Sequence, residues 1–342
     1  MSHILYESEI EQISLELLRD ENGYVILYGP DLLEGASPDR GYSEVVLKNR
    51  LRTAIDRINP RIPEEAREEA YKKALRTHAL TVIDNNEAFH HLLTEGVDVK
   101  FSIGEGKSRT DKVWLVDFAV PENNEFLAVN QFTVVENNVN KRPDIVLFIN
   151  GLPLVVIELK NAADEKADVQ AAFHQLQTYQ QVIPSLFTFT AFEVISDGWF
   201  AKAGTISSDY SRFMEWKSLD GVHVVDSKHE PELESLIRGL LNKTTLLDII
   251  RHFIVFEKTK EKTIKKVAAY HQYFAVNKAI VSTLRASANE NGHFAAEHPA
   301  VYGLPTVEAQ PKGDKRAGVV WHTQGSGKSL SMVFYAGKLV LA

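Results

Sequence analysis

The stretch that decides the fold covers residues 141–160 and reads KRPDIVLFINGLPLVVIELK. Two apolar runs flank an Asn-Gly pair at 150–151, and this pair between two strands is the strongest short-range signal for a β-hairpin. Charges stand at the open end: Asp144 begins the first run, and Glu158 and Lys160 end the second. The sequence therefore predicts an apolar hairpin that carries two acids and a lysine at its open end.

The register of this hairpin decides whether the three charged side chains meet. Glu158 and Lys160 are two residues apart, so they leave the same face of their strand. A strict two-residue turn places Asp144 opposite Ile157 and points its carboxylate to the other face. A three-residue connection, or a bulge beside Asp144, puts all three charges on one face. If the charges form a site, we predict this shifted register.

Two carboxylates and a lysine at a strand end suit metal-assisted hydrolysis of a phosphodiester. Asp144 and Glu158 would hold Mg²⁺ through oxygen ligands. Lys160 would orient the attacking water or neutralise developing charge. The alternative is that Asp144 only starts a strand and that Glu158 and Lys160 are a solvated strand end. The Pro-Asp pair before the hairpin, and the thirteen residues between the two acids, favour the functional interpretation.

These residues resemble the PD-(D/E)xK nucleases and, more narrowly, the N-terminal part of the R (restriction and translocation) subunit of type I restriction endonucleases. The resemblance covers nearly the whole chain, and residues 130–161, NQFTVVENNVNKRPDIVLFINGLPLVVIELKN, carry it. It implies Mg²⁺-dependent cleavage of double-stranded DNA away from the recognition site, after ATP-driven translocation. It also implies a complex with modification (methyltransferase) and specificity subunits.

The same resemblance indicates three further site residues. The family's Q-x-x-x-Y element is matched by Gln175 and Tyr179, which share a helix face and would contact DNA or support the site. For Tyr179, a helix edge that covers the sheet is the alternative. Many nucleases of this fold use an acid on an N-terminal helix as a further metal ligand, and Glu44, on a predicted helix over 43–58, is our candidate. Its alternative role is a favourable interaction with the helix dipole.

A second motif, HTQGSGKS at 322–329, follows a predicted short strand at 318–321 and opens a helix. This is the context of a phosphate-binding loop for ATP. Backbone N–H groups at a helix N-terminus bind phosphate oxygens, while the loop lysine reaches the β- and γ-phosphates and the following serine binds Mg²⁺. His322 stands where the general pattern has glycine, as it varies in superfamily-two helicase-like motors. The predicted cofactor-binding residues are Gly325, Ser326, Gly327, Lys328 and Ser329.

Upstream, the segment AYHQYFAV at 269–276 resembles the adenine-contacting Q-motif of those motors. The amide of Gln272 would pair with an adenine edge. A polar residue on an aromatic helix is the alternative. Five lysines between Lys258 and Lys266 are expected on a solvated helix, with contact to DNA phosphates as the second interpretation.

The periodicity along the chain predicts an α/β protein. The resemblance implies a restriction-endonuclease-like mixed sheet flanked by helices, followed by helices and the beginning of a RecA-like lobe. We expect a nuclease domain over 1–225, a helical connector with the Q-motif-like segment over 226–285, and the start of the ATPase lobe over 286–342. Within the first part, strands are expected in the segments 24–28, 97–103, 112–120, 126–135, 144–149, 152–159, 187–196 and 198–205, and helices near 10–18, 43–58, 64–80 and 168–183.

The amino-acid composition excludes several classes of protein and of functional site. The chain has 342 residues, 46 Asp and Glu against 38 Lys and Arg, a formal charge of −8, and no cysteine. Disulfide scaffolds, thiolate zinc sites and cysteine nucleophiles are therefore excluded. No apolar run approaches the ~18 residues that span a bilayer, and the N-terminus does not read as a signal peptide, so we expect a cytoplasmic protein with no membrane partner. The net negative charge argues against a surface that binds nucleic acid over its whole extent, and it is compatible with a local basic groove.

Thirteen residues follow Ser329, too few for the acidic partner and the second-lobe arginine that ATP hydrolysis requires. We therefore expect a truncated motor portion without ATPase activity of its own. Two other functions remain open: a non-catalytic module that grips DNA or docks subunits, and an ATP-binding module with a degenerate nuclease fold.

Overall fold

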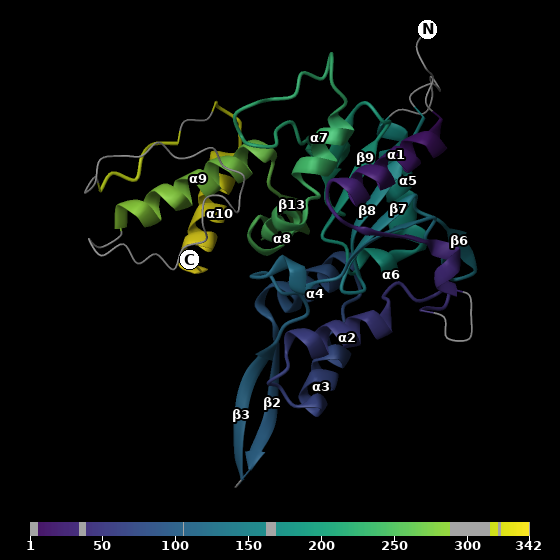
Figure 1. Cartoon of the computed structure of the whole chain (residues 1–342), viewed down its shortest axis with the longest axis vertical. Coiled ribbons are helices and arrows are strands. Elements are labelled where there is room, and N and C mark those ends of the chain that lie inside the picture. Colours follow the sequence, from purple (N-terminus) through teal and green to yellow (C-terminus); the bar gives the residue numbers. More distant parts are fainter. Residues whose placement is uncertain are drawn as a thin grey trace.

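The computed structural model describes residues 6–33, 39–104, 106–161, 169–287, 315–320 and 323–341. Figure 1 shows a central sheet with helices around it, a long two-stranded arm, and a C-terminal helix pair. The chain is a mixed α/β protein, as predicted. None of the described helices is long and apolar enough to cross a lipid bilayer.

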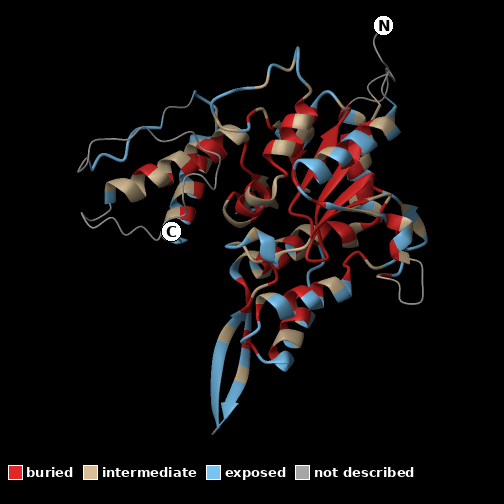
Figure 2. Ribbon diagram, viewed as in Figure 1, coloured by how far each residue is buried: buried red, intermediate tan, exposed pale blue. Residues whose placement is uncertain are grey.

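The main sheet has seven strands and mixed direction. In spatial order they are β1 (Val25–Tyr28), β4 (Phe126–Asn130), β7 (Ile145–Ile149), β8 (Leu152–Leu159), β9 (Phe192–Ser196), β10 (Ala201–Gly204) and β11 (Met214–Glu215). The β1–β4 and β8–β9 pairs are parallel and the others antiparallel. Every residue of β7 and β8 is buried, so this hairpin forms the centre of the core (Figure 2).

The β7–β8 hairpin contains one extra residue. The turn is the two-residue Asn150–Gly151 connection, with Ile149 opposite Leu152. Beyond it the register shifts, because Leu147 pairs with Val155 while Phe148 pairs with Pro153. Leu154 is therefore the bulged residue. The shifted register that we predicted is confirmed, but the bulge lies near the turn and not beside Asp144.

The turn is fixed from both sides. Asn150 (φ 52°) and Gly151 (φ 80°) both adopt left-handed backbone conformations, as a type I′ turn requires. Asn150 is fully buried, and its amide donates to the carbonyl of Leu115 (3.0 Å). The Gly151 carbonyl accepts from Leu47 N–H (2.9 Å), immediately before helix α2 (Lys48–Ile58). The predicted helix over 43–58 therefore begins at residue 48.

Helix α5 (Val169–Val182) covers the face of the sheet that carries Glu158. The parallel pairing of β8 with β9 sets Val156 beside Glu193, and Glu193 accepts a hydrogen bond from Gln180 of α5 (2.7 Å). Val156 and Glu158 are two residues apart and share a face. The remaining helices of this region are α1 (Glu7–Asp20), α3 (Glu64–Ala74), α4 (Val82–Glu95), α6 (Pro184–Phe187) and α7 (Glu232–Gly239).

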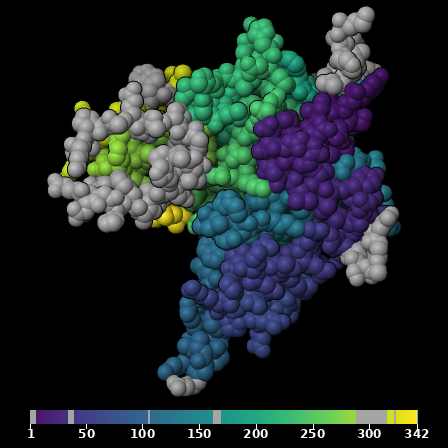
Figure 3. Space-filling view, viewed as in Figure 1, coloured from purple at the N-terminus to yellow at the C-terminus, as the bar shows by residue number. Residues whose placement is uncertain are grey.

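Strands β2 (Val97–Gly104) and β3 (Lys107–Val113) form an arm whose base packs on α3, where Lys73 donates to the Asp98 carbonyl (2.7 Å), and whose tip projects from the body (Figure 3). The strand predicted over 112–120 is wrong beyond Val113. There Trp114 is half-buried without a strand partner, and the Asn59 side chain satisfies its backbone N–H and carbonyl, each at 2.8 Å. A second small hairpin pairs β5 (Val134–Glu136) with β6 (Val139–Lys141).

The helical connector predicted over 226–285 contains a hairpin, β12 (Ile254–Lys258) and β13 (Thr263–Val267), so the helix prediction is wrong there. One lysine of this lysine-rich segment is buried. Lys265 is 1% exposed, and its ammonium donates to the Asn86 amide oxygen and the Thr190 carbonyl, each at 2.8 Å. The hairpin is thus fixed to α4 and to the segment before β9.

Helices α8 (Lys243–His252), α9 (Tyr270–Ser287) and α10 (Lys328–Leu341) form the C-terminal part. A buried ion pair joins them: Lys338 of α10 lies 2.6 Å from Asp248 of α8, and it also donates to Asn277 of α9 (2.9 Å). The strand predicted at 318–321 is not formed over the described residues 315–320, where Val319 is 91% exposed. Trp321 and His322 lie outside the described residues.

The turn provides a stability prediction. Gly151→Ala should lower the free energy of unfolding by at least ~2 kcal/mol, because a left-handed conformation costs an L-residue about 1–2 kcal/mol. In addition, the new Cβ would lie 2.5 Å from the Leu47 carbonyl. Urea unfolding measures the loss. Gly104→Ala is the matched control, since its φ is also positive but nothing lies within 4 Å of the Cβ. Equal losses for the two variants would contradict the close approach to Leu47.

Candidate active site

The open end of the β7–β8 hairpin brings the two predicted acids together. Ile145 pairs with Ile157, so continuing the register by one residue places Asp144 opposite Glu158 on the same face. The backbone N–H of Leu159 donates to Asp144 Oδ2 (2.7 Å) and fixes that carboxylate. Asp144 is 8% exposed and Glu158 is fully buried.

Lys160 completes the group. Its ammonium lies 2.8 Å from Glu158 Oε1 and donates to the Leu159 carbonyl (2.8 Å). Its backbone N–H donates to the Ser196 carbonyl at the end of β9 (2.9 Å). The structure therefore brings Asp144, Glu158 and Lys160 into one site, and its lysine is fixed through both side chain and backbone.

Burial sets the protonation of the site. It raises the pKa of Asp144 to about 6, although the Leu159 N–H and Lys160 counteract it. Burial, together with the neighbouring Asp144, raises the pKa of Glu158 well above its ordinary value. Burial alone would lower the pKa of Lys160, but Glu158, Asp144 and Glu7 together raise it. The two acids thus repel each other in a dry site, and the lysine only partly compensates.

One carboxylate oxygen of the site has no partner among the described residues. Glu158 Oε2 is buried and accepts no hydrogen bond from any of them. A buried unsatisfied acceptor is costly, and a carboxylate costs more than a neutral group. A hard divalent cation between Asp144 and Glu158 would satisfy this oxygen and relieve the repulsion of the acids. The donor set therefore fits Mg²⁺, although no three His, Cys, Asp or Glu side chains cluster with ligand spacing among the described residues.

Gln175 and Tyr179 lie above the acids on α5. The Gln175 amide donates to the Tyr179 hydroxyl (2.5 Å), and that hydroxyl donates to the Arg142 carbonyl (3.4 Å), two residues before Asp144. Burial raises the pKa of Tyr179, and the charge of Glu158 adds to this effect. Both predicted residues are thus beside the site, and Tyr179 is buried enough to serve also as part of the sheet cover.

Helix α1 supplies two acids that the sequence analysis missed. Glu7 lies 3.9 Å from the Lys160 ammonium. Glu11, one turn later, accepts from the amides of Asn130 (2.7 Å) and Gln131 (2.6 Å) at the end of β4. Their i,i+4 spacing on an amphipathic helix was the available signal, but only the packing of α1 on the sheet shows where they point.

Glu44 does not join these acids. It precedes helix α2, so the helix-face argument for it is wrong. Its carboxylate accepts from Gly41 N–H (2.8 Å) and pairs with Lys48, and these are its hydrogen-bond and ion-pair partners among the described residues. The Lys48 hydrogen bond, with the Gly41 N–H, lowers the pKa of Glu44, the opposite direction to the shifts at Asp144 and Glu158.

The predicted phosphate loop opens α10, which begins at Lys328. Gly325 and Gly327 have positive φ, and the Lys328 ammonium donates to the Thr323 carbonyl (2.9 Å). Gln272 of α9 reaches this loop, because its amide donates to the Gly327 carbonyl (3.1 Å). The structure therefore brings Gln272 and the loop together through the loop backbone.

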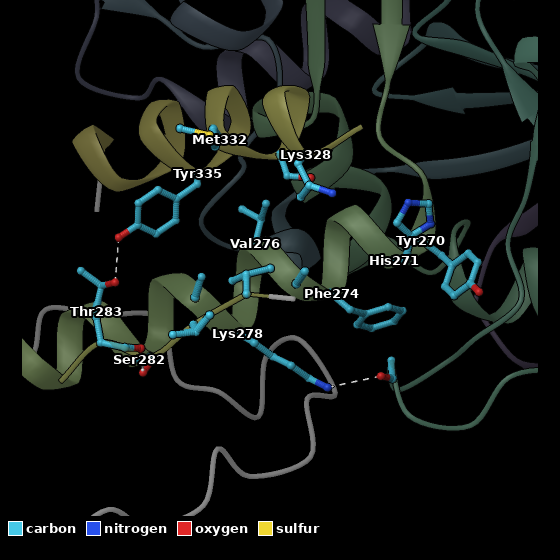
Figure 4. Close-up of a pocket in the computed structure, with 18 of the residues that line it drawn as sticks. Tyr270, His271, Phe274, Val276, Lys278, Ser282, Thr283, Lys328, Met332 and Tyr335 are labelled. Carbon is cyan, nitrogen blue, oxygen red and sulfur yellow. Dashed lines mark hydrogen bonds between the residues drawn. The ribbon is translucent and has the colours of Figure 1, made fainter. Parts of the chain in front are cut away.

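Next to the loop, α9 and α10, together with residues of the segments 221–224 and 317–320, line an open cavity of about 930 Å³. Figure 4 shows Phe274, Lys278 and Ser282 on one side of it and Lys328, Met332 and Tyr335 on the other.

Fold and site define the class: an α/β protein with a restriction-endonuclease-like sheet and a buried acid pair beside a lysine. Residues 4–212 match the family model described as "Type I restriction enzyme R protein N terminus", and residues 271–342 match "SWI2/SNF2 ATPase". The chain belongs to the type I restriction enzyme R protein family.

Relatives with curated names agree with this family. The HindI endonuclease subunit of a type I restriction enzyme from Haemophilus influenzae is 42% identical over 98% of this chain and 30% of its own length. A provisionally named MjaIXP endonuclease subunit of a type I restriction enzyme from Methanocaldococcus jannaschii is 32% identical over 96% of this chain and 31% of its own length. The chain thus spans about 30% of the length of these relatives.

The pKa of Asp144 gives a pH prediction for the metal-free protein. Because this pKa is about 6 instead of 3.8, the folded state keeps a proton that the unfolded state has released, so stability falls as the pH rises through this window. Asp144→Asn removes the effect. We expect its free energy of unfolding, relative to wild type, to rise between about pH 4 and pH 7 by on the order of 2 kcal/mol.

Urea unfolding in EDTA over this pH range measures the difference. Glu44→Gln is the matched control and should change with the opposite sign, because the pKa of Glu44 is lowered. A difference between Asp144→Asn and wild type that stays constant with pH would show that Asp144 titrates normally.

Proposed function

We propose that this chain is the nuclease portion of a type I restriction enzyme and cleaves double-stranded DNA by metal-assisted hydrolysis at a PD-(D/E)xK site. One observation carries the proposal: Asp144 and Glu158 stand opposite each other, buried, with Lys160 beside them and with Glu158 Oε2 accepting no hydrogen bond from the described residues. A purely structural acid pair would have its acceptors satisfied.

The residues of the site have distinct tasks. Asp144 and Glu158 would hold Mg²⁺, which supplies, when bound, a Lewis acid for the phosphoryl oxygen and a lowered pKa for water. Lys160, kept protonated by the neighbouring acids, orients the attacking water and neutralises charge on the phosphate. Gln175 and Tyr179 cover the acids on the α5 side and exclude bulk water from them.

For the additional N-terminal acid of the site, we propose Glu7 and Glu11 in place of the predicted Glu44. Glu7 and Glu11 on α1 face the site, and Glu44 does not. We propose that Glu7 holds the Lys160 ammonium on its far side and that Glu11, fixed by Asn130 and Gln131, adds negative potential for the cation.

We also propose that the C-terminal part of the chain contains a nucleotide-binding site. The loop 325–329 would bind ATP phosphates at the start of α10, with Gln272 contacting both loop and adenine. The division into nuclease domain (1–225), connector (226–285) and start of an ATPase lobe (286–342) is part of it. Translocation on DNA and partnership with modification and specificity subunits are proposed for the complete complex. The alternative to the nuclease function is a module that binds DNA without cleaving it.

The nuclease proposal is tested by cleavage. A complete type I complex that carries this chain is incubated with supercoiled plasmid, Mg²⁺ and ATP. Asp144→Ala and Glu158→Gln should lower the cleavage rate at least about 100-fold, the scale of losing a metal ligand or an electrostatic catalyst. Glu44→Gln is the matched control and should cleave as wild type does. Unchanged cleavage by Asp144→Ala would leave the DNA-gripping module as the better function.

Nucleotide binding is tested separately. Lys328→Ala should weaken binding of a non-hydrolysable ATP analogue at least about tenfold, because a charge-assisted contact to the phosphates is lost. Calorimetric titration measures the affinity. Lys260→Ala, an exposed lysine on the turn between β12 and β13, should bind as wild type does. If Lys328→Ala retains full affinity, the loop is not the phosphate site.

A further inference from the structure

Two cations without partners stand directly before the catalytic acid. Lys141 ends β6 and is half-buried, and Arg142 is exposed. Neither side chain has a hydrogen bond or ion pair within the part of the chain that the structure describes. Their backbone is nevertheless fixed, because Lys141 pairs with Val134 and the Arg142 carbonyl accepts from Tyr179. This is uncompensated positive charge held next to the site.

The third cation of the site differs in this respect, because the Lys160 ammonium is paired with Glu158 (2.8 Å). In a chain with a formal charge of −8, Lys141 and Arg142 therefore place two positive charges beside the two acids. Lysine and arginine side chains that neutralise phosphates supply most of the salt-dependent affinity for DNA.

An exposed aromatic turn lies on the other flank. Trp199 and Phe200 follow β9 and are 39% and 44% exposed. The turn is nevertheless rigid: Asp197 accepts from the backbone N–H groups of both residues (3.0 and 2.7 Å), and the Trp199 indole donates to the Ser227 carbonyl (2.8 Å). Rigid, exposed aromatic side chains are the kind that stack on bases or wedge between them.

The turn is attached to the site itself. It begins directly after Ser196, whose carbonyl holds the Lys160 backbone. Gly198 (φ 90°) packs so closely on α1 that a Cβ there would lie 2.9 Å from Ile10. The start of β7 and the end of β9 lie at the same end of the sheet and are separated by β8 alone, so at ~4.8 Å per strand these two strand ends lie about 10 Å apart. The residue pairs Lys141–Arg142 and Trp199–Phe200 adjoin these two strand ends, and a duplex whose major groove alone is ~12 Å wide is large enough to span them.

We propose that duplex DNA lies along this end of the sheet, held by Lys141 and Arg142 through its phosphates on one side of the acids and by Trp199 and Phe200 on the other. The proposal rests on the proposed nuclease function and adds the residues that hold the substrate over Asp144 and Glu158. The two pairs contribute differently to the affinity for DNA. The contribution of the cations falls as the salt concentration rises, and the contribution of the aromatic pair does not depend on salt.

The experiment is fluorescence anisotropy of a labelled random-sequence duplex with the 342-residue chain, titrated in EDTA between roughly 50 and 200 mM salt. The Lys141→Ala/Arg142→Ala double variant should reduce the slope of log affinity against log salt by about 2, close to 0.9 per lost phosphate contact. The Trp199→Ala/Phe200→Ala double variant should weaken binding about tenfold at every salt concentration with the slope unchanged.

Matched controls remove the same charge or apolar surface elsewhere. Arg61→Ala/Lys100→Ala removes two exposed cations between α2 and α3 and on β2, and Leu80→Ala/Ile103→Ala truncates two exposed apolar side chains. Circular dichroism verifies folding, and Phe200→Ser alone replaces the aromatic double variant if that variant unfolds. The proposal is wrong if either test pair binds DNA as wild type does, or if the controls lose as much affinity.

Failure of this proposal and failure of the nuclease function are distinguishable. Binding is measured without metal, so it does not depend on whether Asp144 and Glu158 catalyse. A chain that binds through both pairs, in a complex whose cleavage is unaffected by Asp144→Ala, supports the DNA surface and contradicts the nuclease.

Discussion

The site depends on one extra residue in a buried strand. Without Leu154, Asp144 would face Ile157 and its carboxylate would point to the other side of the sheet. Pro153 lies beside the bulge, where a missing N–H is tolerated in an otherwise continuous ladder. A local irregularity near the turn therefore sets the direction of the Asp144 side chain at the far end of the hairpin, and this direction brings Asp144 onto the face of Glu158.

The stability of this arrangement is limited by its own charges. Two acids are buried opposite each other, and one oxygen of Glu158 accepts no hydrogen bond from the described part of the chain. The single ammonium of Lys160 interacts with both acids. The apolar strands around them provide the stability that the charged end lacks, since all of β7 and β8 is buried. This division between a rigid apolar hairpin and an electrostatically strained end is typical of functional sites, which cost stability and are supported by rigid elements.

The sequence was informative where a local pattern determines the structure. The hairpin and the helix with Gln175 and Tyr179 follow from spacing within a few residues. The shifted register was predicted from the requirement that Asp144, Glu158 and Lys160 share one face, and the local pattern did not show where the bulge lies. The α1 acids were missed because their position depends on how a helix packs on a distant strand. Glu44 was misassigned because the helix begins at Lys48. The hairpin of β12 and β13 was read as helix because its lysines were taken as a solvated face, whereas Lys265 is buried.

The buried Lys265 also determines where this protein can be divided. Its ammonium is the donor for the Asn86 oxygen and the Thr190 carbonyl inside the core that carries the acids. A chain that ends near residue 225 would lose this ammonium donor and keep both acceptors. The two buried oxygens would then have no hydrogen-bond donor, which destabilises the fold. The nuclease sheet and the β12–β13 hairpin of the proposed connector therefore share one packed core, so the proposed boundary near residue 225 does not separate two independently packed parts.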